Sequence, residues 1–122
     1  MQKILVVDDE QDIRDMLKKR LEQAGYSAVT ASGGEEAISS AKSDKPDLIL
    51  LDIAMPLMDG YQACEKLKAD KDTKDIPVLF LTAKDLAPQS IYERYEKLGA
   101  AGYMPKPSQF SDLLKKIKEI IG

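Results

Sequence analysis

Histidine is absent from this chain of 122 residues, and cysteine occurs only once, at Cys64. Without histidine, the chain cannot itself supply a histidine nucleophile, a histidine base or a histidine-ligated zinc site. A single cysteine excludes an internal disulfide and a thiolate metal cluster.

Long apolar runs and an excess of basic charge are also missing. No apolar run approaches the roughly 20 residues that span a bilayer, and Met1-Gln2-Lys3 leads straight into a short apolar stretch rather than a signal peptide. The formal net charge of -3 is a poor electrostatic match for DNA or an anionic membrane. We expect a cytoplasmic protein without membrane contact and without direct contact with nucleic acid.

The composition that remains is that of one folded domain. Apolar residues make up 43% of the chain and charged residues 32%, which is too apolar for a disordered segment. No repeat, linker or low-complexity stretch divides the sequence. We expect residues 1–122 to form a single domain.

Short apolar runs alternate with segments of helical periodicity. The predicted strands cover residues 4–7, 28–31, 48–51, 78–81 and 103–104, and apolar positions at helical spacing mark helices within 13–24, 37–41, 63–67, 91–98 and 110–120. The strongest runs are apolar at every position, which predicts strands buried on both faces. The sequence therefore predicts an α/β fold with a five-stranded parallel sheet and five helices on its two sides.

Polar side chains follow four of these predicted strands. Asp8 and Asp9 come after the first strand, Asp52 after the third, Thr82 after the fourth and Lys106 after the fifth. Ligands of such folds bind beyond the carboxyl ends of the strands. Three carboxylates, a hydroxyl and an ammonium group are therefore expected at one edge of the sheet.

These carboxylates need a partner if they lie together. Two unit charges 4 Å apart repel by about 4 kcal/mol at an effective dielectric constant near 20. Oxygen ligands without histidine or cysteine suit a hard cation, and we expect Mg²⁺. A carboxylate beside Mg²⁺ and a lysine would be an anionic nucleophile for a transferred phosphoryl group.

Each of these residues also has an ordinary structural explanation. Asp8 and Asp9 could cap the first helix, and Asp52 could be a loop aspartate. Thr82 and Lys106 taken singly are unremarkable at a strand end. Their joint order along the chain is what favours a site. Asp59, in contrast, is interpreted only as a turn residue and cap of the third helix.

The sequence closely resembles the receiver domain of two-component response regulators, of the single-domain chemotaxis type, from Lys3 to Ile121. The residues that carry the resemblance are Val6–Glu10, Leu50–Gly60, Leu81–Ala83 and Gly99–Pro107. The resemblance implies a flavodoxin-like, doubly wound sheet of strand order 2-1-3-4-5. It also implies a signalling module that catalyses only its own phosphorylation and dephosphorylation.

The resemblance assigns a role to each candidate residue. Asp52 would accept the phosphoryl group, and Mg²⁺ would be held by Asp8, Asp9, Asp52 and the backbone carbonyl of Ala54. Thr82 and Lys106 would contact the phosphoryl oxygens. Tyr103 would be the switch aromatic that turns inward as Thr82 moves, and the Lys106-Pro107 bond would be cis.

Some positions differ from the commonest family pattern. Ala54 and Lys84 stand two residues after Asp52 and Thr82, at positions that tune the phosphoryl lifetime in this family. Ser108-Gln109 replaces a frequent apolar residue, and the stretch 84–90 looks slightly long.

The implied partner is a sensor histidine kinase or a histidine phosphotransfer protein. The fourth helix, with Tyr92, and the fifth strand and helix would form the phosphorylation-sensitive face, for a second copy or a downstream protein. An alternative from another class is a Mg²⁺-dependent phosphohydrolase with an aspartyl nucleophile. Flavin binding is disfavoured because Asp8, Asp9 and Glu10 would repel the cofactor phosphate.

Overall fold

The computed structural model describes residues 1–83, 94–106 and 109–122, without the side chains of Thr82, Ala83 and Lys106. The strands and helices alternate through most of this chain. In order they are β1 (Lys3–Val7), α1 (Gln11–Gln23), β2 (Ser27–Ala31), α2 (Gly34–Asp44), β3 (Leu48–Asp52), α3 (Gly60–Ala69), β4 (Val78–Ala83), β5 (Gly102–Lys106) and α5 (Phe110–Ile121).

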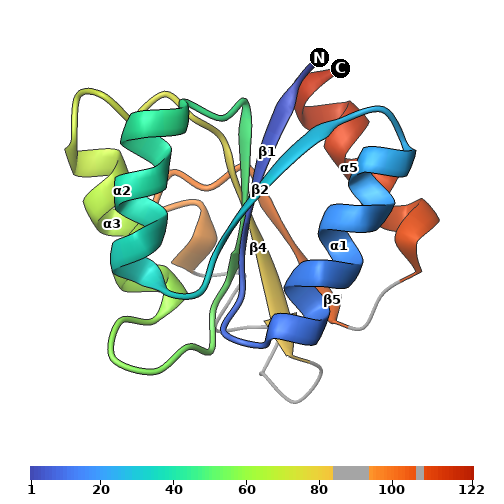
Figure 1. The fold of residues 1–122 in the computed structure, drawn as a ribbon. Helices are drawn as coiled ribbons and strands as arrows, with labels where there is room; N and C mark the ends of the chain where they lie inside the picture. Colours follow the sequence, from blue (N-terminus) through green and yellow to red (C-terminus); the bar gives the residue numbers. More distant parts are fainter. Residues whose placement is uncertain (84–93, 107–108) are drawn as a thin grey trace.

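The five strands form one parallel sheet in the order β2-β1-β3-β4-β5. This confirms the predicted α/β class and strand order. Helices α1 and α5 lie on one side of the sheet, and α2 and α3 lie on the other (Figure 1). None of the helices in the described residues is long and apolar enough to cross a membrane.

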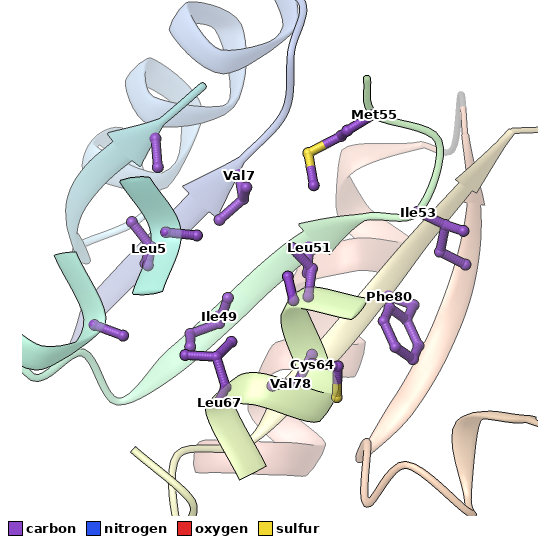
Figure 2. Packing of buried hydrophobic residues seen from close by; sticks show 14 of the residues in the cluster. Leu5, Val7, Ile49, Leu51, Ile53, Met55, Cys64, Leu67, Val78 and Phe80 are labelled. Carbon is purple, nitrogen blue, oxygen red and sulfur yellow. The ribbon is translucent and has the colours of Figure 1, made fainter. Parts of the chain in front are cut away.

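Burial on both faces explains why the strands are apolar at every position. All five residues of β3 are buried. Alternate residues of this strand belong to different cores: Ile49 and Leu51 face α2 and α3, whereas Leu48 and Leu50 face α1 and α5. Figure 2 shows the first of these cores, where Leu67 of α3 packs near Ile49 and Val78. The central strand is thus fixed from both sides, and so is its carboxyl end.

The predicted number of five helices needs a correction. The described residues contain four helices. The predicted fourth helix, within 91–98, lies partly outside the described residues, at 91–93. Tyr92 and Lys84 lie outside them as well. After a helical Arg94-Tyr95, the chain turns, and Gly99 adopts a φ of 78° while Ala100 N–H donates to the Tyr95 carbonyl at 2.9 Å. The left-handed glycine closes the turn directly after the predicted helical range 91–98.

Candidate functional site

The carboxyl ends of β1 and β3 place two buried aspartates on neighbouring strands. Val7 of β1 pairs with Leu51 of β3, so the next residues along these strands are Asp8 and Asp52. Asp8 has no exposed surface and Asp52 is only 3% exposed. A buried carboxylate requires compensation by a proton, a cation or hydrogen bonds, so this pair marks the sheet edge as a candidate site.

Hydrogen bonds fix the orientation of Asp8. Its amide donates to the Ala31 carbonyl at 3.2 Å and continues the pairing of β1 with β2. Its Oδ1 accepts a hydrogen bond from the Glu10 amide at 2.9 Å. Glu10 occupies the N-cap position of α1 and makes no side-chain cap. Asp8 is therefore not the N-cap of α1, as its ordinary structural explanation proposed, although its carboxylate accepts a hydrogen bond from the amide of the N-cap residue.

Asp8, Asp9 and Glu10 form an acidic cluster, in which one carboxylate oxygen from each lies within 4.8 Å of the others. Asp8 is buried, whereas Asp9 and Glu10 are exposed. Sequence reasoning assigned no ligand role to Glu10, although it directly follows the predicted acid pair. Three carboxylates at this distance repel one another, so the cluster favours a bound cation with oxygen ligands.

The loop from β3 to α3 is held against the phospho-acceptor candidate by Gly60. The Gly60 amide donates to the Ile53 carbonyl at 2.8 Å. A Cβ on Gly60 would collide with the Asp52 carbonyl oxygen and lie 2.7 Å from Ile53 Cα. Glycine is therefore required here by the close approach of two backbone segments. Ala54 is exposed in this loop, between the buried side chains of Ile53 and Met55.

Asp59 has the structural role that the sequence predicted. Its side chain accepts a hydrogen bond from the Gln62 amide at 2.9 Å, and the Gln62 side chain accepts one from the Asp59 amide at 3.0 Å. This reciprocal pair is a capping box at the start of α3. The Asp59 carboxylate is thus occupied in capping α3, which makes Asp59 a suitable control residue for substitutions at Asp52.

The backbone positions of Thr82 and Lys106 lie at the same edge of the sheet. Asp52 pairs with Leu81, which places Thr82 one residue further along β4. In turn, Ala83 pairs with Lys106 at the end of β5. The contacts of both side chains lie outside the described structure. Their convergence on Asp52 remains a prediction.

Tyr103 is half-buried on β5 and packs against the core on the side of α2 and α3. It lies opposite Phe80 of β4 in the sheet. Its ring makes an edge-to-face contact with Tyr95, with 5.2 Å between the centroids. The candidate switch aromatic therefore contacts the turn that precedes β5, and its predicted movement stays a prediction.

The arrangement matches a known family. The family model of the response regulator receiver domain matches residues 4–118. The alkaline phosphatase synthesis transcriptional regulatory protein PhoP of Bacillus subtilis is 43% identical over 98% of this chain. That match covers 48% of PhoP. Response regulator MprA of Mycobacterium avium is 40% identical over 98% of this chain, and the match covers 50% of MprA. The chain spans about half the length of these curated relatives.

Solved structures show the same fold. The chemotaxis protein CheY4 of Vibrio cholerae superposes with a TM-score of 0.90 at 32% identity, over 98% of both chains. The receiver domain of a sensor histidine kinase from Pseudomonas aeruginosa has a TM-score of 0.87 at 30% identity, over 99% of this chain and 98% of that one. That structure holds a magnesium ion coordinated in its active-site cleft.

Proposed function

This chain belongs to the response regulator receiver family, and we propose that Asp52 is the residue that accepts its phosphoryl group. The observation that carries the proposal is the burial of Asp52 beside Asp8 at the carboxyl edge of a parallel sheet. An acidic cluster adjoins this pair. Carboxylates buried together at the ligand-binding edge of a parallel sheet are typical of a functional site.

The donor atoms at this edge fit Mg²⁺. They are carboxylate oxygens, and hard oxygen ligands are those that Mg²⁺ prefers. We propose Asp8, Asp9, Asp52 and the backbone carbonyl of Ala54 as the protein's contribution, with Glu10 close enough to interact through water. When bound, the cation would offset the charge of the carboxylates and of the phosphoryl oxygens.

The proposed reaction is a transfer from a phosphohistidine of a partner protein. A carboxylate oxygen of Asp52 attacks phosphorus, a P–O bond forms and the N–P bond breaks. The electron pair of that bond stays with the partner's imidazole. Thr82 would donate a hydrogen bond to a phosphoryl oxygen, and Lys106 would bring a positive charge to it. Their placement at the ends of β4 and β5 supports these roles.

The proposed partner is a sensor histidine kinase or a histidine phosphotransfer protein, in the cytoplasm. Residues 1–122 contain no histidine, so the donor imidazole must lie outside them. After transfer, Thr82 and Tyr103 would alter the face formed by β5, α5 and the segment before β5. A second copy of the domain or a downstream protein would bind that face. The domain is proposed to extend over residues 1–122.

The alternative of a Mg²⁺-dependent phosphohydrolase is not favoured. That chemistry uses a second acid beside the nucleophile to protonate the leaving group. Ile53 and Ala54 follow Asp52 and supply none. We propose that the chain acts on itself and has no multiple turnover on phosphomonoesters.

Labelling with a small acyl-phosphate donor tests the acceptor. In the presence of Mg²⁺, the intact protein should gain the mass of one phosphoryl group and lose it in hydroxylamine. Asp52→Asn removes the nucleophilic charge at nearly constant size and should abolish the gain. Asp59→Asn is the matched control, because Asp59 caps α3 and should leave labelling intact. Equal labelling of wild type and Asp52→Asn would overturn the assignment.

A further inference from the structure

Asp8 is held at three different atoms. Its amide is bound to β2 through the Ala31 carbonyl, and its carboxylate accepts from the Glu10 amide. The third contact is made by Arg14, whose Nη1 donates to the Asp8 carbonyl at 2.6 Å. That carbonyl belongs to the peptide that joins Asp8 to Asp9. The orientation of this peptide is therefore set by an arginine six residues away.

Arg14 reaches this carbonyl from the first turns of α1. Its own amide donates to the Glu10 carbonyl at 3.1 Å, which fixes the backbone of this helical turn. The side chain is half-buried and extends back toward the strand end. A guanidinium donor makes a short, charge-assisted hydrogen bond, stronger than one between neutral groups. The contact thus restrains the peptide that follows the last strand residue.

We propose that Arg14 is a positioning residue for the Mg²⁺ site, which holds the Asp8-Asp9 peptide so that both carboxylates point to one place. This inference rests on the proposed function, since it concerns the same metal ligands. Carboxylate ligands that are aligned before the cation arrives bind it more tightly, because ordering these side chains on binding reduces the affinity. Groups that orient metal ligands without touching the metal typically change metal affinity by about 10–100-fold when they are removed.

A competing role for Arg14 is that of a simple counter-charge. The charge of Arg14 does act on one acidic residue, Glu36. The pKa of Glu36 is held below its usual value mainly by hydrogen bonds from Ser32 and to a smaller extent by the charge of Arg14. The two roles predict opposite changes in the affinity for Mg²⁺ when Arg14 is replaced. Removing a nearby positive charge should tighten binding of a cation, whereas removing a positioning contact should weaken it.

Titration calorimetry with MgCl₂ at constant ionic strength separates these roles. For Arg14→Met, which keeps the length of the side chain but not the donor, the Kd for Mg²⁺ should rise about tenfold. Arg14→Lys can still donate to the Asp8 carbonyl and should recover part of the affinity. Arg20→Met is the matched control, because Arg20 is also on α1 but lies over the Phe110 ring, 5.6 Å from its centroid. It removes the same charge and should leave the Kd unchanged or slightly lower.

A spectroscopic measurement on the metal-free protein provides a second test. The amide of Asp9 belongs to the peptide that Arg14 holds, so its nitrogen and proton shifts should change in Arg14→Met and much less in Arg20→Met. Mg²⁺ binding by Arg14→Met that is as tight as in wild type, or tighter, would overturn the positioning role. If wild type itself failed to bind Mg²⁺, the proposed metal site would fall, and the role of Arg14 with it. Retained binding in wild type with no effect of Arg14→Met would refute only the inference.

Discussion

Replacing Gly60 with alanine tests whether the phospho-acceptor loop is held by contact between two backbone segments. The added methyl group would collide with the Asp52 carbonyl oxygen and lie 2.7 Å from Ile53 Cα. These are main-chain atoms at the end of a buried central strand, so no rotamer change can relieve the collision. Either α3 must move away or the end of β3 must shift.

The expected loss of stability follows from three contributions. Overpacking against a rigid neighbour costs about 1–3 kcal/mol. Displacing the Gly60 amide from the Ile53 carbonyl, now 2.8 Å away, removes a hydrogen bond worth about 0.5–1.5 kcal/mol net. Alanine also restricts the unfolded chain more than glycine does, which stabilises the folded state by about 0.4–1 kcal/mol. The free energy of unfolding should therefore fall by about 0.5–4 kcal/mol.

Urea denaturation measures this change, with Gly33→Ala as the matched control. No heavy atom lies within 4 Å of the Cβ position at Gly33, and its φ of -168° is ordinary extended backbone. The control should change stability by less than about 1 kcal/mol, because it alters only an N-cap preference. Phosphoryl labelling of Gly60→Ala should also slow under folding conditions, since the Asp52 backbone is displaced. Equal stability of the two variants would refute the close-approach argument.

Three further outcomes test other parts of the structure. Leu57 is fully exposed at a φ of 69°, so Leu57→Asn should stabilise the protein by roughly 0.5–1 kcal/mol in urea denaturation, and a loss would contradict the strain argument. Burial raises the pKa of the Cys64 thiol to about 11 from 9.0. As the pH rises, the thiol therefore ionises in the unfolded chain before it ionises in the folded one. The difference in free energy of unfolding between wild type and Cys64→Ala should be constant below pH 9 and should decline toward pH 11. A difference that does not depend on pH would contradict the raised thiol pKa. The Arg94 guanidinium lies 3.8 Å from the Tyr61 ring centroid, so Arg94→Met should cost up to about 1 kcal/mol in wild type and nothing in a Tyr61→Leu background, as a double-mutant cycle would show.

Local sequence pattern was sufficient for the sheet. The run Leu48–Asp52 is apolar until its last residue, which predicted both a strand buried on two faces and a carboxylate at its carboxyl end. The parallel arrangement followed because each strand was separated from the next by a segment with helical periodicity. The position of Asp52 at the functional edge is a consequence of that topology alone.

The fourth predicted helix illustrates the limit of such patterns. Apolar spacing at Ile91, Tyr95 and Leu98 is compatible with a helix, yet Arg94-Tyr95 is followed by a turn closed by Gly99. Residues before Arg94 lie outside the described part of the chain. A glycine stop is a local signal, whereas the extent of a helix also depends on its packing partners.

The sequence by itself determined the fold class, the strand order through family resemblance and the clustering of acids at strand ends, since these depend on residue spacing along the chain. Only the tertiary structure decided which atoms make contact there. Arg14 is one basic residue among several on α1, and nothing in its neighbourhood in the sequence marks it as the donor to the Asp8 carbonyl. Likewise, the collision that forbids a side chain at Gly60 arises only where α3 meets the end of β3. Such contacts are fixed by how helices pack on the sheet, and ångström-scale distances between packed elements are not encoded in any single local pattern.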